Sequence, residues 1–296
     1  MNSDQLQMGF DSDTSTQTSF TCTTLSSVMA AEITGLNLAR ATTADMARIR
    51  ELFLKQHLLV VRRQTLDDAD IERFAAYFGQ LEVNQVKNSD GGVLPAVHSI
   101  ANVDAEGKPS KSPLLKSNYN WHSDKSYLPQ PSLMTMLYGL EVPPVGGDTQ
   151  FANMELAWED LPDAMKKRIA GLRVVQSFEH MLDKLGQRSI IDPALIPPPV
   201  EHPLVRTHPE TARKSLFVGM YSCKIIGMEQ VEAEKLIAEL IAHATQEKYT
   251  FTQKWQPLDF VFWDNRSLVH RAIPNYEMAA HRRILRRCVV RGGVPQ

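Results

Sequence analysis

The stretch Asn120-Trp121-His122-Ser123-Asp124 places an imidazole and a carboxylate two residues apart. If it forms a strand, residues i and i+2 point to the same face, so both side chains can reach one metal ion. A second imidazole, His270, follows the apolar run Phe260-Val261-Phe262-Trp263, which predicts a strand. The sequence therefore predicts a metal site made by His122, Asp124 and His270.

A His-x-Asp triplet by itself is weak support, because such triplets occur by chance. In the alternative interpretation, His122 is a hydrogen-bonded core residue and Asp124 accepts hydrogen bonds in a turn. Two further features favour the metal site: Gly146-Gly147-Asp148-Thr149 after a predicted strand, and an arginine-rich segment, 282–287, shortly after His270. Two histidines and one carboxylate leave positions open on a metal, as in non-haem Fe(II) oxygenases.

Taken in order, these elements resemble the taurine dioxygenase/TfdA family of Fe(II)/2-oxoglutarate-dependent dioxygenases. That family has His-x-Asp, then a Thr, a distant His, and an Arg shortly after it. The resemblance runs from about Thr24 to Gly293. It implies three cofactors or cosubstrates, Fe(II), 2-oxoglutarate and O₂, with release of succinate and CO₂. It also implies that Thr149 and Arg283 hold 2-oxoglutarate, Arg283 through a guanidinium that suits a carboxylate.

The arginine-rich segment contains four candidates for anion binding. On a strand, Arg283 and Arg287 share one face, and Arg282 and Arg286 share the other. By resemblance, Arg283 contacts the cosubstrate and Arg287 grips the anionic group of the prime substrate. We expect Arg282 and Arg286 to form surface ion pairs.

The resemblance implies that the substrate is an organic acid of small or medium size. Asn118 and Tyr221 fall where the family contacts substrate, although Tyr221 also fits a core residue with a satisfied hydroxyl. The segment 81–87 lacks the histidines of taurine dioxygenases, and Trp121-His122-Ser123-Asp124 is closer to the chlorophenoxyacetate branch. Both features argue against taurine.

Several chemical outcomes stay open at this stage. Asp124 argues against halogenation, since radical halogenases of the superfamily lack that carboxylate, and hydroxylation is the favoured outcome. Desaturation or cyclisation in natural-product biosynthesis, a catalytically silent acid-binding protein, and a Zn or Mn site in the same fold are the alternatives.

The composition agrees with an enzyme that acts on small molecules. The chain has 296 residues, 43% of them hydrophobic, and a formal net charge of −2, which does not suggest nucleic acid or an anionic membrane as a partner. No apolar run approaches the roughly 18 residues of a membrane span. Cys22, Cys223 and Cys288 are few and far apart, which indicates reduced thiols in a cytoplasmic protein. The resembled family often forms dimers or tetramers, so a homo-oligomer is an expectation.

The predicted fold is mixed α/β with a mainly β core, a double-stranded β-helix or cupin-like jelly roll surrounded by helices. Residues 1–20 are polar and predict a disordered tail, followed by a single domain over 21–296. A Pro-rich stretch, Ile191 to Pro203, predicts no regular element, and residues 177–203 are a candidate lid. The sequence also predicts strands near 31–35, 58–61, 96–100 and 133–137. Helices are expected over 43–57, 66–79, 153–170 and 229–244. Thr43 would cap the first of these helices, and the third would contain a second helix with Pro162 in its first turn.

Overall fold

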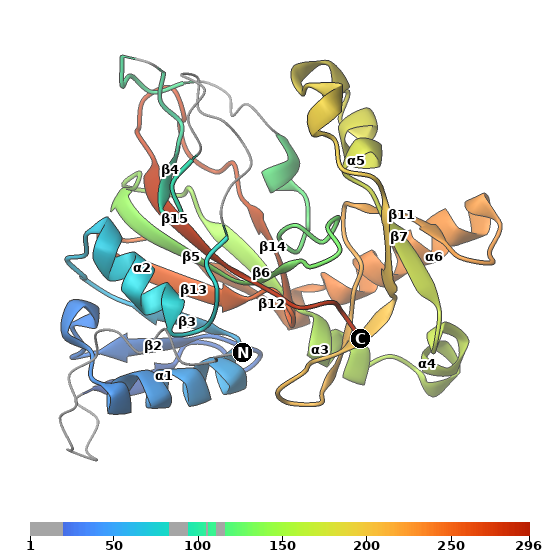
Figure 1. The fold of residues 1–296 in the computed structure, drawn as a ribbon, viewed down its shortest axis with the longest axis horizontal. Helices are drawn as coiled ribbons and strands as arrows, with labels where there is room; N and C mark the ends of the chain where they lie inside the picture. Colours follow the sequence, from blue (N-terminus) through green and yellow to red (C-terminus); the bar gives the residue numbers. More distant parts are fainter. Residues whose placement is uncertain (1–19, 83–93, 105, 111–115) are drawn as a thin grey trace, which may run out of the picture.

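Strand β3, Leu58–Val61, is buried on both faces and lies inside the larger sheet, between β2 and β13. Leu59 and Val61 join one hydrophobic cluster, while Leu58 and Val60 join another on the opposite side. Side chains alternate along a strand, so four consecutive apolar residues require cover on both faces. The computed structural model, which describes residues 20–82, 94–104, 106–110 and 116–296, provides this cover with helices on one side and a second sheet on the other (Figure 1).

The larger sheet has seven strands in the order β1-β2-β3-β13-β5-β15-β4. All neighbours pair antiparallel except β2 and β3, which are parallel. Its strands are β1 Thr21–Thr24, β2 Ala31–Thr34, β3, β4 His98–Ala101, β5 Ser132–Glu141, β13 Phe260–Asp264 and β15 Ile284–Arg291.

The second sheet has three antiparallel strands in the order β12-β6-β14, and it carries the distal histidine. Its strands are β6 Thr149–Asn153, β12 Thr250–Gln253 and β14 Leu268–Ala272. Phe151 of β6 stacks edge-on against Trp263 of β13, with ring centroids 5.2 Å apart, in the core between the sheets. Two sheets, antiparallel except for the β2–β3 pair, face each other across a common core and make the predicted jelly roll.

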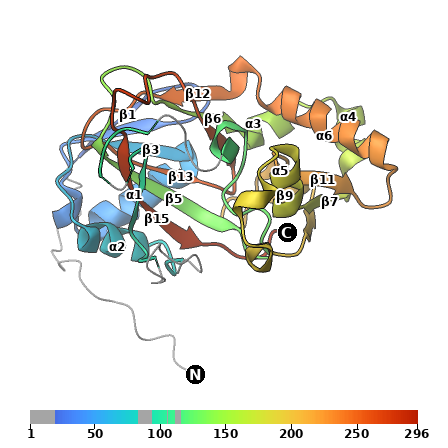
Figure 2. The ribbon, with the colours of Figure 1, turned by 90° about the horizontal axis from the view of Figure 1, so that it is seen from above.

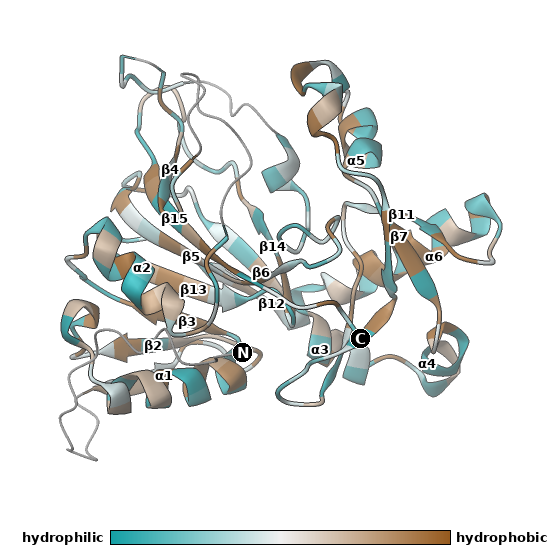
Figure 3. Ribbon diagram, in the orientation of Figure 1, coloured by the Kyte–Doolittle hydropathy of each residue, from teal (hydrophilic) through white to brown (hydrophobic). Residues whose placement is uncertain are grey.

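Two amphipathic helices, α1 Thr43–Gln56 and α2 Asp68–Ala76, cover the outer face of the larger sheet (Figures 1 and 2). Both carry alternating hydrophobic and hydrophilic segments in Figure 3, as helices on a sheet surface do. Phenylalanine rings around Phe74 fill this interface, with Phe260 and Phe262 at centroid distances of 5.2 and 5.0 Å. The predicted cap is off by one residue: Thr42 caps α1 in a reciprocal capping box with Asp45.

Most of the remaining elements pack around a third hydrophobic cluster on the other side of the molecule (Figure 1). Two small antiparallel sheets, β11-β7-β8 and β10-β9, pack there with helices. The strands are β7 Arg173–Gln176, β8 Val200–Pro203, β9 Val205–Thr207, β10 Lys214–Leu216 and β11 Ser222–Ile225. The helices are α3 Met154–Glu159, α4 Asp163–Ile169, α5 Phe178–Lys184 and α6 Gln230–Ala244, with short 3-10 turns at Leu38–Arg40, Lys116–Tyr119, Arg188–Ile190, Pro193–Leu195 and Glu247–Tyr249.

Two expectations need correction here. Pro162 is the N-cap of α4, one position before the first turn. The end of the Pro-rich stretch is regular after all: Val200–Pro203 pairs antiparallel with β7 as strand β8. Pairing with β7 satisfies the backbone hydrogen-bonding groups of this segment. The candidate lid, 177–203, contains helix α5 and ends with β8, and its role as a lid stays a prediction.

Two further expectations concern the N-terminal tail and membrane spans. Of the predicted tail, 1–20, only Phe20 belongs to the described residues. In the described part of the chain, no helix is both long and apolar enough to cross a membrane.

The buried C-cap of α1 leads to a pH-dependent stability prediction. His57 has a positive φ of 62°, is 4% exposed, and lies with Nε2 3.6 Å from Glu155 Oε2. Burial lowers its pKa to about 4. The unfolded chain binds this proton below about pH 6.5 and the native state does not, so the free energy of unfolding falls as pH drops from about 6.5 to about 4.

The substitution His57→Asn removes this titration, and asparagine tolerates the left-handed conformation. Between pH 7 and pH 4.5, we expect the variant to lose about 2 kcal/mol less free energy of unfolding than the wild type. Urea unfolding at the two pH values measures this difference directly. Equal losses in the two proteins would show that His57 is not buried in the neutral form.

Candidate metal and cosubstrate site

His122, Asp124 and His270 come together as predicted, with one ligand atom from each lying within 4.8 Å of the others. His122 Nε2 is 3.9 Å from Asp124 Oδ1, and His270 Nε2 is 3.9 Å from Asp124 Oδ2. In the described part of the chain, this is the one group of histidine, cysteine and acidic side chains with the geometry for a metal ion.

The local structure of the first two ligands differs from the expected strand. His122 forms an isolated bridge with His270, through reciprocal backbone hydrogen bonds of 3.0 and 2.8 Å. Asp124 begins a turn, and Lys125 after it has a φ of 54°. The turn directs Asp124 toward the two imidazoles, so the two-residue periodicity of a strand does not create this proximity.

Protonation suits a divalent cation. The Asn120 carbonyl oxygen lies 2.7 Å from His122 Nδ1, so a proton on that nitrogen leaves Nε2 as the metal-facing lone pair. Burial lowers the pKa of both histidines, that of His270 to about 3, and keeps the imidazoles neutral. Burial opposes ionisation of Asp124, but the charge of Arg287 and a hydrogen bond from Thr135 outweigh it and hold its pKa well below the usual range. Two neutral imidazoles and a carboxylate are a donor set that fits Fe(II).

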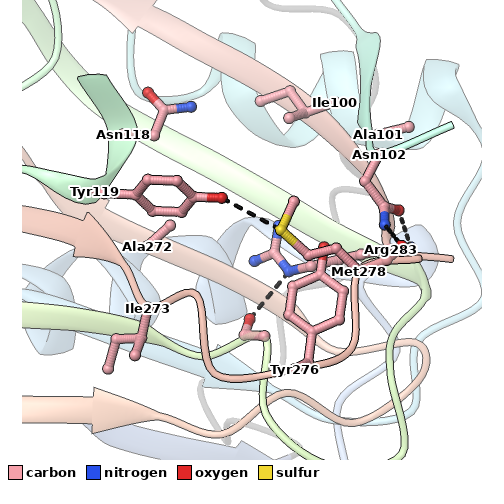
Figure 4. A pocket seen from close by; sticks show the side chains of 11 residues that line it. Ile100, Ala101, Asn102, Asn118, Tyr119, Ala272, Ile273, Tyr276, Met278 and Arg283 are labelled. Carbon is pink, nitrogen blue, oxygen red and sulfur yellow. Dashed lines mark hydrogen bonds between the residues drawn. The ribbon is translucent and has the colours of Figure 1, made fainter. Parts of the chain in front are cut away.

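Arg283 lines a cavity together with Ala272, which lies two residues after His270 on β14 (Figure 4). Its Nε donates to the Gly147 carbonyl oxygen at 3.0 Å, and no carboxylate of the described residues is within ion-pair distance. Tyr119 and Tyr276 line the same cavity. Burial lowers the pKa of the guanidinium, but arginine keeps its charge under such conditions. A partly buried cation without an acidic partner is a site for an anionic ligand.

Thr149, at the start of β6, is oriented by a residue that the sequence did not single out. Trp255 Nε1 donates to Thr149 Oγ1 at 3.1 Å. An indole N–H has no acceptor capacity, so the Thr149 hydroxyl accepts this bond and its own proton is left for another acceptor. The Arg283 guanidinium carbon lies 5.8 Å from the centroid of the same Trp255 ring. Trp255 thus links the two predicted cosubstrate residues.

The two faces of the arginine segment separate as predicted. Arg282 and Arg286 form surface ion pairs, the first with Glu141 at 3.0 Å and the second with Asp68. Arg287 is on the inner face, where its Nη2 lies 3.1 Å from Asp124 Oδ1. In this structure the predicted substrate clamp therefore contacts an expected metal ligand.

The other predicted substrate residues lie on two sides of the triad. Asn118 lines the cavity of Arg283. Tyr221 is buried beside His122, with ring centroids 6.4 Å apart, and contacts Tyr127 and Phe178. We call these aromatic residues and the apolar residues packed with them the aromatic cluster: Tyr127, Phe178, Met181, Leu182, Met220 and Tyr221. Tyr127 and Phe178 were missed, although Tyr127 lies only three residues after Asp124.

Gly147, in the turn before Thr149, lies against the side chain of Arg283. Gly147 has a φ of +69°, and a Cβ there would lie 2.8 Å from Pro143 Cγ and 3.2 Å from Arg283 Cδ. We expect Gly147→Ala to weaken binding of N-oxalylglycine, an analogue of 2-oxoglutarate, by about tenfold, the effect of about 1.4 kcal/mol. Calorimetric titration in the presence of Mn(II) measures this.

Gly171→Ala is the matched control, because Gly171 has a φ of +77° and nothing within 4 Å of its Cβ position. Both variants carry the backbone strain of a non-glycine residue at positive φ, but only the first displaces Arg283. Equal affinity in the two variants would argue against this contact.

Comparison with known proteins agrees with this geometry. The family model described as "Taurine catabolism dioxygenase TauD, TfdA family" matches residues 21–289. The alpha-ketoglutarate-dependent 2,4-dichlorophenoxyacetate dioxygenase of Burkholderia sp. (strain RASC) is 35% identical over 268 residues, covering 86% of this chain and 90% of that protein. An alkylsulfatase of Acinetobacter baylyi is 30% identical over 276 residues, covering 89% and 82%. The crystal structure of AAD-2 in complex with Mn(II) and N-oxalylglycine has a TM-score of 0.79 and 30% identity, covering 93% of this chain and 98% of that one.

Proposed function

The chain belongs to the TauD/TfdA family and is an Fe(II)- and 2-oxoglutarate-dependent dioxygenase, and we propose that its substrate is an organic anion with an apolar body that Arg287 and the aromatic cluster hold for hydroxylation. The observation that carries this proposal is a partly buried arginine that contacts Asp124 of the metal triad, close to the aromatic side chains of Tyr127 and Tyr221. Fe(II), 2-oxoglutarate and O₂ together supply the oxidising power, and 2-oxoglutarate leaves as succinate and CO₂.

The residues of this chain bind and orient the reactants. We infer that His122, Asp124 and His270 hold the metal, which leaves positions for the cosubstrates. Arg283 and Thr149 hold 2-oxoglutarate, supported by the unpaired charge of the first and the free hydroxyl proton of the second. Charge-assisted hydrogen bonds of this kind fix the orientation of a carboxylate.

Substrate selectivity follows from the surroundings of Arg287. Tyr127 and Tyr221 are close enough to Arg287 and Asp124 for these charges to act on their pKa values, and burial raises that of Tyr127 to about 12. Both phenols are therefore neutral and present ring surface to a ligand. An anion on Arg287 with its apolar part against these rings matches this chemistry, and Asn118 would border the ligand from the side of the Arg283 cavity.

A substrate panel tests the proposal. We would measure O₂-dependent succinate formation with phenoxyacetate, an unsubstituted alkyl sulfate and taurine. The expected result is stimulation by the first or second and none by taurine, whose two-carbon body offers little apolar surface to pack against the aromatic rings. Stimulation by taurine above the other two would overturn the proposed selectivity.

Arg287 and Arg286 form a matched pair for testing the substrate clamp. We expect Arg287→Gln to raise KM for the organic acid by about 30-fold or more, the effect of losing about 2 kcal/mol or more from a desolvated charge pair. Arg286→Gln removes a neighbouring charge on the outer face and should leave KM unchanged. Calorimetric affinity for N-oxalylglycine should stay the same in both variants. A KM that responds to Arg286 instead would contradict the assignment.

We also propose a cytoplasmic location. Cys22, Cys223 and Cys288 are free thiols, which supports a reducing compartment. Cell fractionation tests this, and thiol blocking in extracts would detect any disulfide.

A further inference from the structure

Asp124 is held by hydrogen bonds from outside the metal triad. Thr135 Oγ1, on β5, lies 2.5 Å from Asp124 Oδ2, and Asn265 Nδ2 lies 2.9 Å from Thr135 Oγ1. Thr135 is 1% exposed and Asn265 is fully buried. Neither contacts His122 or His270 through a side-chain hydrogen bond in the described part of the chain, so their shared target is the carboxylate.

The direction of these hydrogen bonds follows from donor and acceptor chemistry. Trp263 Nε1 can only donate, and it lies 3.1 Å from Asn265 Oδ1, which fixes the amide with its oxygen toward the indole. The Asn265 nitrogen then faces Thr135 as a donor. The Thr135 hydroxyl accepts from it, so its single proton points to Asp124.

Asn265 also connects the segment that carries the ligands to the buried interior. Its carbonyl oxygen accepts from Ser123 Oγ at 2.8 Å and from Arg206. Its backbone N–H donates to the Leu133 carbonyl oxygen at 2.9 Å. The Asp124 backbone N–H donates weakly to Asn265 Oδ1 at 3.4 Å. One residue thus holds the backbone around Asp124 and, through Thr135, its carboxylate.

We propose that Thr135 and Asn265 are positioning residues that restrict Asp124 to offering a single oxygen to the metal, an inference that rests on the proposed function. With Oδ2 engaged by Thr135, the carboxylate cannot turn to chelate the metal with both oxygens, and Oδ1, which contacts Arg287 in this structure, is the oxygen left for the metal. Positions on the metal then stay open for 2-oxoglutarate and O₂. Outer-shell partners of metal ligands typically contribute 10- to 100-fold to metal affinity or activity, which roughly sets the expected effect here.

Isosteric substitutions test this network. Thr135→Val removes the hydroxyl at nearly constant volume, and Thr135→Ser keeps it. Asn265→Asp keeps the shape but replaces the donor with an acceptor, so the Thr135 proton turns away from Asp124. The readouts are the affinity of the apoprotein for Co(II), by competition with a chelator, and the visible spectrum of the Co(II) protein.

We expect Thr135→Val and Asn265→Asp to weaken Co(II) binding by about 10- to 100-fold and to change the spectrum, whereas Thr135→Ser stays close to the wild type. Cooperative urea unfolding of each apoprotein establishes that it is folded. If Asn265→Asp does not fold, the result for Thr135→Val alone tests the inference. Wild-type affinity and spectrum in folded Thr135→Val would overturn the inference.

A different result would contradict the proposed function. It fails if the wild-type Fe(II) protein forms no succinate with any substrate of the panel, and the Co(II) comparison remains decisive in that case.

Discussion

Asp124→Ala is expected to abolish succinate formation and to weaken Fe(II) binding by more than about 100-fold, beyond the usual effect of losing an outer-shell partner. Asp124 is the single carboxylate of the triad, and both imidazoles approach it to 3.9 Å. Without its charge, two neutral imidazoles remain for a divalent cation. Chelator competition under anaerobic conditions and a succinate assay in air measure the two effects.

The same substitution has a second consequence in the apoprotein. Arg287 would lose the acidic partner 3.1 Å away and remain buried. Breaking a buried ion pair typically costs about 3–5 kcal/mol, so the apoprotein should unfold at clearly lower urea concentration.

The control is Asp160→Ala, which removes a fully exposed carboxylate paired with Lys248. This variant should retain metal affinity and activity. Full activity in Asp124→Ala would mean that the metal, if bound, lies elsewhere.

The second large effect is expected for Arg283→Gln. Its guanidinium is the buried charge without an acidic partner, and the proposal gives it the distal carboxylate of 2-oxoglutarate. Removing one partner of a buried charge pair costs about 2–5 kcal/mol, which corresponds to a rise in KM for 2-oxoglutarate of about 30-fold to several thousandfold. Arg283→Lys should fall between, because an ammonium keeps the charge but not the two-pronged geometry.

Arg282→Gln is the control, one residue away but on the surface with Glu141. It should leave KM for 2-oxoglutarate unchanged. The readouts are KM from succinate formation and the affinity for N-oxalylglycine from calorimetry. A normal KM in Arg283→Gln would move the cosubstrate out of this cavity.

Much of the site could be predicted, because residue type and local periodicity carry it. The donor set of the metal follows from the identities of His122, Asp124 and His270. The separation of Arg283 and Arg287 from Arg282 and Arg286 was predicted from strand alternation, and it is observed although Arg282 and Arg283 precede strand β15. The roles of Thr149 and Arg283 came from family resemblance, and they remain proposals that the cavity and the Trp255 hydrogen bond support.

What could not be predicted depends on contacts between distant segments. Thr135 lies in an apolar strand, and its partner Asn265 is 130 positions away. Trp255 is 106 positions from Thr149. The strand β8 forms only because β7 is beside it, and the Pro-rich sequence gives no local sign of that pairing.

The sequence by itself determined which chemical groups are available, that strands and helices alternate as in a jelly roll, and that two arginines face inward. Those properties are local: they depend on side-chain chemistry and on spacings of a few residues. Tertiary structure alone decided that Asp124 lies in a turn, that Arg287 contacts it, and that Thr135 and Asn265 hold its carboxylate. These contacts exist because the two sheets bring β5, β13 and β14 together around one core, and no local pattern encodes the closing of the chain over such distances.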